Sequence, residues 1–255
     1  MIDQKGVIIK TKISALTFEE TVNQIQTWSS NKKRSYVCIC NTHSLVTAYK
    51  NEQFRDALEN SALNTPDGMP LVWGLKMLGF KRQNRVDGPN LMLKLCEDSG
   101  AKNTRIFLYG NTDENLKELE KELKAKYPDI KIVGKYSPPF RKLSQEEQES
   151  IIRMINDSHA DITFVSLGCP KQELWMYKNS QHINGIMIGV GAAFDFIIGK
   201  VKRPPMIFQK MGLEWLFRLL AEPKRLWKRY FYNNPMYVYL FIKTYRKNKK
   251  IQNII

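Results

Sequence analysis

The sequence predicts an α/β fold, in which a Rossmann-like, mainly parallel sheet carries helices on both faces and a basic helical appendage follows. The first observation is an alternation of short apolar runs with longer amphipathic stretches, which is typical of β-α-β units. The second is a break in composition near Arg203, beyond which basic and aromatic residues accumulate. We therefore expect an α/β domain over residues 1–202 and an appendage over residues 203–255.

Local patterns place the elements of the α/β domain. Helix starts are marked by Ser/Thr-x-x-Glu capping boxes at Thr17 and Ser144 and by Thr112 before the helical segment 114–126. Short apolar runs that suit strands separate these helices. The predicted strands are residues 7–9, 36–40, 105–109, 130–133, 162–166 and 186–190.

The appendage differs from the rest of the chain in charge. Twelve of the 40 Lys and Arg residues lie from Arg203 onward, against only Glu214 and Glu222, and the whole chain carries a net charge of +15. Eleven aromatic residues lie there too. Such a segment suits an anionic surface, either nucleic-acid phosphate or anionic lipid. Pro223 and Pro235 each suit the first turn of a helix, so we expect three helices, over residues 206–221, 223–233 and 235–248.

Composition excludes several classes of protein. The four cysteines form no Cys-x-x-Cys pair and no Cys/His cluster, which argues against zinc and favours a reducing compartment. The N-terminus shows no secretion signal, and the most apolar run, 185–199, is short of the ~20 residues that span a bilayer. We expect a cytoplasmic protein without a transmembrane segment.

Three glycine-containing junctions between a strand and a helix could receive a ligand, because helix N-termini attract phosphate. The first ends at Gly110, and a tight turn would explain it equally well. The second places Lys171 and Gln172 in the first turn of a helix, where they could face a diphosphate; a solvated helix start is the alternative. The third joins Gly191 to Asp195, a possible partner for a base or ribose; close helix–sheet packing is the alternative.

Two further segments carry charged candidates. Asp67 lies in a polar turn that follows Thr65, where a carboxylate could act as a base, although Pro-Asp-Gly is also ordinary turn chemistry. Arg85 could lie beside an anion, or it could be a surface arginine next to a capping Asp87. The sequence contains no Asp-x-Asp pair, which argues against a divalent metal held by carboxylates, and nothing in it indicates a cofactor.

These segments together resemble the WecG/TagA/CpsF glycosyltransferase family, in five or more motifs that occur in the same order over most of the chain. The matching motifs are Thr65-Pro66-Asp67-Gly68-Met69-Pro70, Arg85-x-x-Gly88, Leu167-Gly168-Cys169-Pro170-Lys171-Gln172-Glu173, Gly191-Ala192-x-Phe194-Asp195, Gly199-x-x-x-Arg203-x-Pro205, Gly212-Leu213-Glu214-Trp215, Arg218-Leu219 and Glu222-Pro223-x-Arg225.

The resemblance implies inverting transfer from a UDP-sugar to a polyprenyl-diphosphate-linked sugar, in teichoic acid, capsule or related polysaccharide synthesis. We expect this transfer to be metal-independent because the sequence lacks an Asp-x-Asp pair. N-acetylmannosamine is the best-known sugar of the family, and glucosyl or other hexosyl transfer is the alternative. The general base implied is Asp67, and the pocket residues are Asn41, Arg85 and Gln172. The appendage matches a membrane-binding segment of the family. If it also supplies groups to the active site, Arg218 and Arg225 are the candidates.

The expected partners are therefore the UDP-sugar, the lipid-linked acceptor and the anionic inner face of the cytoplasmic membrane, to which the protein would bind peripherally. A homo-oligomer is also possible, and no nucleic acid is expected. Two interpretations from other classes compete: a nucleic-acid-binding protein, suggested by the basic appendage, and a non-catalytic membrane adaptor with a nucleotide-binding fold. Only the enzyme and the adaptor predict saturable binding of UDP.

Overall fold

The computed structural model describes residues 4–252, apart from the side chains of residue 225 and residues 247–252. Within that part of the chain the principal sheet is fully parallel and has six strands in the order β4-β3-β8-β7-β5-β6. These strands are β3 (Ser35–Cys40), β4 (Leu63–Pro66), β5 (Arg105–Gly110), β6 (Lys131–Tyr136), β7 (Ile162–Ser166) and β8 (Ile186–Gly189). A separate antiparallel hairpin, β1 (Lys5–Ile8) and β2 (Thr11–Ser14), precedes them.

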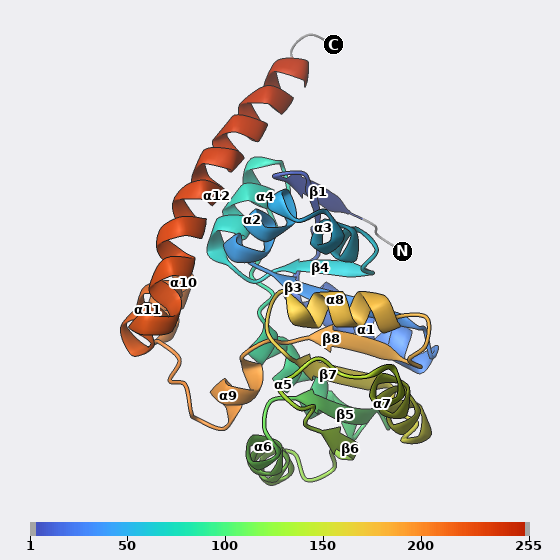
Figure 1. The fold of residues 1–255 in the computed structure, drawn as a ribbon. Coiled ribbons are helices and arrows are strands. Elements are labelled where there is room, and N and C mark those ends of the chain that lie inside the picture. The colour runs from blue at the N-terminus through green and yellow to red at the C-terminus, as the bar shows by residue number, and fades with distance from the viewer. Residues whose placement is uncertain (1–3, 253–255) are drawn as a thin grey trace.

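Helices cover both faces of this sheet, as the alternation of elements predicts (Figure 1). One face packs against α2 (Thr42–Lys50), α3 (Glu52–Glu59), α4 (Met69–Met77), α7 (Gln145–Asp157) and α8 (Lys171–Asn179). The other face packs against α1 (Phe18–Ser30), α5 (Gly88–Ser99), α6 (Asp113–Lys126) and α9 (Ala193–Ile197).

Successive residues of β3 show why the core has two halves. Cys38 and Cys40 belong to the first half, whereas Val37 and Ile39 belong to the second, because neighbouring side chains of a strand point to opposite faces. The strands are buried on both sides, which explains their nearly continuous apolar sequences. The fold class predicted from the sequence is confirmed.

The predicted helix starts are also confirmed. The side chains of Thr17 and Ser144 each accept a hydrogen bond from the backbone N–H of the glutamate three residues ahead. The side chain of that glutamate accepts a hydrogen bond from the backbone N–H of the capping residue, so both capping boxes form. Thr112 caps α6 through the backbone N–H of Asn115.

The appendage forms α10 (Met206–Lys210), α11 (Glu214–Ala221) and α12 (Pro223–Gln252), and α12 runs along the outside of α2 and α4 (Figure 1). The prediction of a helix break at Pro235 is wrong, because this proline lies inside α12. Tertiary contacts on both sides of Pro235 offset the hydrogen bond that proline cannot donate: Leu226, Tyr237 and Leu240 are buried. None of the described helices combines the length and hydropathy of a membrane-crossing segment.

Candidate active site

A polar cavity opens beyond the carboxyl ends of β3, β7 and β8, which is where parallel α/β sheets bind ligands. Its wall comes partly from these strand ends and partly from α11 and α12, so the appendage closes it. The side chains in its lining that carry charged or hydrogen-bonding groups are Asn41, Asp67, Arg85, Cys169, Gln172, Glu173, Glu214, Arg218 and Arg229.

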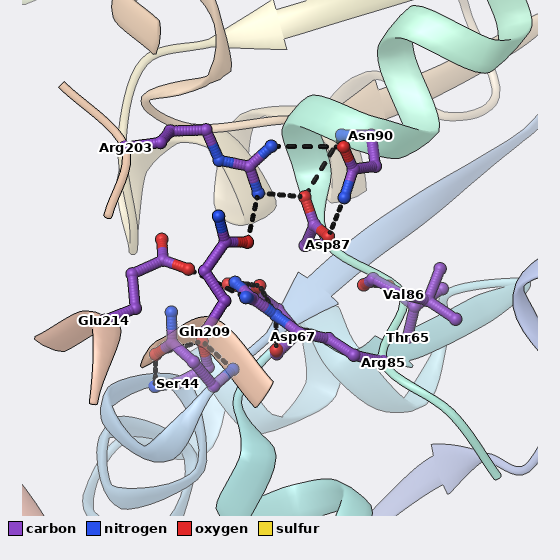
Figure 2. Close-up of polar contacts among 11 residues, drawn as sticks. Ser44, Thr65, Asp67, Arg85, Val86, Asp87, Asn90, Arg203, Gln209 and Glu214 are labelled. Carbon is purple, nitrogen blue, oxygen red and sulfur yellow. Dashed lines mark hydrogen bonds and ion pairs between the residues drawn. The ribbon is translucent and has the colours of Figure 1, made fainter. Parts of the chain in front are cut away.

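Asp67 directly follows β4, and its backbone N–H donates a 2.9 Å hydrogen bond to the carbonyl oxygen of Cys40 at the end of β3. This bond ties the turn to the neighbouring strand of the sheet. The Asp67 carboxylate points toward Arg85, whose Nη2 lies 2.7 Å from Asp67 Oδ1, and Arg85 Nε also donates to the backbone oxygen of Asp67 (Figure 2). The turn therefore holds a carboxylate in a defined orientation at the cavity wall.

The same guanidinium reaches a second carboxylate, that of Glu214 on α11. Arg85 Nη1 lies 2.7 Å from Glu214 Oε2, and the Arg85 and Glu214 side chains are only 17% and 15% exposed. Arg85 is thus a largely buried link between the Asp67 turn and the appendage. The interpretation of Arg85 as a surface arginine is wrong, because α11 covers it.

Burial raises the pKa of the Asp67 carboxyl above its ordinary value, and the nearby Arg85 opposes this shift. About a quarter of the Asp67 side chain remains exposed, toward the cavity that it lines. A carboxylate with a raised pKa that faces a ligand cavity is suited to accept a proton from a bound hydroxyl group.

A second arginine, close to Arg85, also pairs with a carboxylate. Arg203, the first residue of the appendage, places Nη2 2.9 Å from Asp87 Oδ1 and donates through Nη1 to Asn90 Oδ1 at 3.1 Å (Figure 2). Asp87 caps α5 as the sequence suggests, since its Oδ1 also accepts from the backbone N–H of Asn90. The segment from Arg85 to Asn90 therefore holds the appendage at two points, Arg203 just before α10 and Glu214 at the start of α11.

The junction between β7 and α8 forms the floor of the cavity. Gln172 Nε2 donates to Glu173 Oε1 at 2.9 Å, and Gln172 Oε1 accepts from the backbone N–H of Gly191 at 3.1 Å. Glu173 is buried, burial raises the pKa of its carboxyl, and its Oε2 has no hydrogen-bond partner among the described residues. The alternative of a solvated helix start therefore does not hold for Gln172 and Glu173, which are buried, whereas Lys171 is exposed to solvent.

The junction between β8 and α9 supplies an open backbone, and Arg218 of α11 supplies a cation beside it. Gly191 has φ +57°, and no atom lies within 4 Å of the position that a Cβ would occupy, so a ligand can approach the backbone there. Opposite it, Arg218 of α11 lies over the Phe196 ring at 5.4 Å, and its Nε has no hydrogen-bond partner within the described part of the chain. Arg218 is therefore available for an anionic group.

Comparison with known proteins decides the family. The sequence profile of the glycosyl transferase WecG/TagA/CpsF family matches residues 7–251. The chain is 31% identical over 226 residues to an N-acetylglucosaminyldiphosphoundecaprenol N-acetyl-beta-D-mannosaminyltransferase of Bacillus spizizenii, covering 88% of this chain and 85% of that protein. It is 32% identical over 212 residues to the protein of the same name from Bacillus subtilis, covering 82% and 79% of the two chains.

The chain belongs to the WecG/TagA/CpsF glycosyltransferase family. In this glycosyltransferase, six of the candidate residues named from the sequence line one cavity, although they come from segments far apart in the chain. These six are Asn41, Asp67, Arg85, Gln172, Gly191 and Arg218. Asn41 also caps α2, accepting from the backbone N–H groups of His43 and Ser44.

Four other candidates lie near the cavity without lining it. Thr65 is buried and donates to the carbonyl oxygen of Val86, and Lys171 is exposed. Gly110 needs no ligand to explain it, because a Cβ there would lie 2.4 Å from the Ser166 carbonyl oxygen. Asp195 accepts hydrogen bonds from Asn111 and Asn115. The side chain of Arg225 lies outside the described part of the structure.

The cavity also contains Glu173 and Glu214, to which sequence reasoning assigned no part in the site, and Arg229, which it counted only among the basic residues of the appendage. Glu214 lies 129 positions from Arg85, so no local pattern could have paired them. The only available signal was that Glu173 and Glu214 belong to the motifs shared with the family.

Proposed function

We propose that this glycosyltransferase moves N-acetylmannosamine from its UDP-linked form to the sugar of a polyprenyl-diphosphate-linked N-acetylglucosamine. The observation that supports this most strongly is a single cavity lined by the Asp67 carboxylate and by Arg218, whose buried Nε has no hydrogen-bond partner among the described residues. The names of both Bacillus relatives describe the same donor sugar and acceptor. Transfer of glucose or another hexose to the same kind of acceptor is the second candidate.

The proposed chemistry is one direct displacement. The acceptor hydroxyl oxygen forms a bond to the anomeric carbon, the bond from that carbon to UDP breaks, and Asp67 takes the hydroxyl proton. UDP leaves with the bonding electrons from the opposite face, which inverts the anomeric configuration. Negative charge that develops on the diphosphate would be stabilised by Arg218 and Arg229 at the same cavity wall.

A donor screen tests the proposal. Each of several UDP-hexoses is incubated with the protein and a soluble N-acetylglucosaminyl diphosphate lipid analogue, and products are identified by mass spectrometry. We expect the N-acetylmannosamine donor to give the highest rate. A preference for UDP-glucose would establish the second candidate, and no product with any donor would refute transfer to this class of acceptor.

Within this proposal the nucleotide lies over the open backbone of Gly191, with Asp195 and the strand end at Gly110 beside it. We expect Asp195→Ala to raise the dissociation constant of UDP by roughly tenfold, since hydrogen bonds to charged groups contribute about 1.5–3 kcal/mol. Titration calorimetry measures the constant. If it is the same as in wild type, the nucleotide lies elsewhere.

We also propose that the reaction needs no metal ion. The described residues contain no group of three or more His, Cys, Asp or Glu side chains placed to hold one. Initial rates in excess EDTA are expected to match those in magnesium. An activity that EDTA abolishes and magnesium or manganese restores would assign the diphosphate to a metal instead of to arginines.

The appendage is proposed to hold the protein on the anionic inner face of the cytoplasmic membrane. The first turns of α12 interleave the exposed cations Lys224 and Lys228 with the exposed rings of Trp227 and Phe231. Cations beside anionic headgroups and aromatic rings at the interface favour such binding. A homo-oligomer is compatible with this arrangement.

Charge reversal tests membrane binding. Because each basic residue near an anionic surface contributes about 1 kcal/mol, Lys224→Glu with Lys228→Glu is expected to lower partitioning to phosphatidylglycerol-rich vesicles by more than roughly tenfold. The matched control is Lys117→Glu with Lys121→Glu, which has the same spacing on the exposed side of α6. Equal losses in both variants would show that only net charge matters.

A further inference from the structure

A second cavity of about 490 Å³ opens beside the Asp67–Arg85 pair and runs between α4, the α10–α11 loop and α12. It meets the polar cavity at Asn41, Asp67, Arg85, Glu214, Arg218 and Arg229, which line both. Its volume lies within the range of small-molecule sites, roughly 300–1,000 Å³. The proposed transfer chemistry uses only the shared end, so the rest of this cavity has no assigned role.

The walls of this second cavity are mostly apolar. Met69, Trp73 and Met77 lie four residues apart along one side of α4, and Val238 and Phe241 of α12 lie opposite. The Met211, Leu213 and Trp215 side chains close the end nearest α11. We call this set the α4–α12 groove.

The groove leaves large apolar side chains open to solvent. Trp73 is 47% exposed, Met77 52% and Val238 53%. Burial in the core does not explain them, and contiguous exposed apolar surface on a folded protein usually marks a binding site. The two walls meet closely where α4 has a glycine: a Cβ at Gly74 would lie 3.1 Å from the Phe241 ring.

The groove is charged at one end and apolar at the other. At one end lie the Asp67 carboxylate and the Arg85, Arg218 and Arg229 guanidinium groups, and at the other end lie Met77 and Val238. Beyond Val238, α12 continues with the exposed side chains of Tyr239 and Ile242. A complementary ligand carries a sugar diphosphate at one end and a hydrocarbon chain at the other.

We propose that the α4–α12 groove binds the isoprenoid units of the acceptor nearest its diphosphate and directs the rest of the chain along α12. The proposal rests on the proposed function, since it places the acceptor hydroxyl at Asp67. Continuity with the polar cavity selects this occupant over a second copy of the chain or an undefined apolar partner. The groove would thus let the enzyme recognise the lipid as well as the sugar.

The test compares two soluble acceptors that differ only in the lipid: N-acetylglucosaminyl diphosphate esterified with farnesol or with methanol. No membrane or detergent is present, so membrane binding cannot contribute. We expect the wild-type KM for the farnesyl acceptor to be lower by roughly tenfold or more, because burial of even a few apolar carbons is that favourable. Turnover at saturation should be similar for the two.

Met77→Glu places a charge in the groove without touching the polar cavity. It is expected to bring the ratio of the two KM values close to one while leaving the rate with the methyl acceptor unchanged. Met154→Glu is the matched control, since Met154 is also an exposed helical methionine, 40% exposed on α7. This control should keep the wild-type ratio.

Binding of the farnesyl acceptor by calorimetry, without donor, separates the two proposals. If the methyl acceptor is glycosylated and wild type shows no preference for the farnesyl acceptor in KM or in binding, the proposal for the groove is wrong and the proposed function stands. If neither acceptor is glycosylated but the farnesyl compound binds and Met77→Glu abolishes binding, the function is wrong and the groove stands. A wild-type dimer that Met77→Glu dissociates, without chain preference, would assign the groove to a second copy.

Discussion

Asp67→Asn is expected to lower the turnover number of sugar transfer by roughly 10²–10⁴-fold, the usual contribution of a general base. The amide keeps the size and most hydrogen bonds of the carboxylate but cannot take the acceptor proton. UDP binding should remain near that of wild type, because Asp67 is proposed to act on the acceptor. Steady-state kinetics measures the first effect and calorimetry the second.

The control for this variant is Asp157→Asn, which removes a carboxylate at the exposed end of α7. It should have wild-type turnover. Turnover within about twofold of wild type in Asp67→Asn itself would show that another group takes the proton. Glu173, a buried carboxyl in the same cavity, would then be the first residue to examine.

The pH profile of the wild type reports on the same carboxyl. Burial raises the pKa of Asp67 above the ordinary value of 3.8, and the base must be deprotonated to act. Activity should therefore fall as the pH drops through this raised pKa, at a higher pH than an ordinary aspartate would give. The Asp67→Asn variant should lack this acid limb.

Arg85→Met is expected to lower the free energy of unfolding by roughly 2–4 kcal/mol near neutral pH, because removing one partner of a buried ion pair leaves the other charge uncompensated. Here two carboxylates, Asp67 and Glu214, lose one cation. We place the cost below that of a fully buried pair because part of Asp67 faces the cavity. Chemical denaturation measures it.

The loss should depend on pH in a defined direction. Arg85 opposes the upward shift of the Asp67 pKa, so its removal raises that pKa further above the unfolded value. A carboxyl with a raised folded pKa destabilises the protein above that pKa, and this cost disappears as the pH falls below the unfolded value. The difference between Arg85→Met and wild type should therefore shrink on acidification.

Two further variants isolate the ion pair. Arg55→Met removes an arginine that pairs with the exposed Glu52 on α3 and should change stability by less than about 0.5 kcal/mol. Adding Glu214→Gln to Arg85→Met should recover part of the lost stability. A single Arg85→Met variant as stable as wild type would mean that Asp67 and Glu214 gain nothing from the guanidinium.

Local signals predicted much of the fold. The capping boxes at Thr17 and Ser144 and the apolar runs of the central strands depend on neighbouring residues, and each formed as expected. Helices α3 and α4 and strand β2 were not anticipated, and α5 was anticipated only through its cap at Asp87. The break expected at Pro235 failed because packing of α12 against α2 outweighs the local cost of proline.

The sequence allowed us to predict the residues of the candidate site that follow strands. It did not allow us to predict the ion pairs between distant segments. Asn41 and Asp67 follow parallel strands, and topology alone brings such positions to one edge of a sheet. The Arg85–Glu214 and Asp87–Arg203 ion pairs join segments more than a hundred residues apart. Such pairs depend on how the appendage packs against the α/β domain, and the spacing of residues along the sequence does not predict this packing.

One measurement tests the proposed transfer most directly: the structure of the product formed from UDP-N-acetylmannosamine and the farnesyl diphosphate-linked N-acetylglucosamine. Mass spectrometry gives its composition, and NMR gives the configuration of the new glycosidic bond. Direct displacement with Asp67 as base predicts a disaccharide diphosphate whose new bond is β, inverted from the α-linked donor. A retained α bond, or no disaccharide from a folded protein that binds both substrates, would contradict the account.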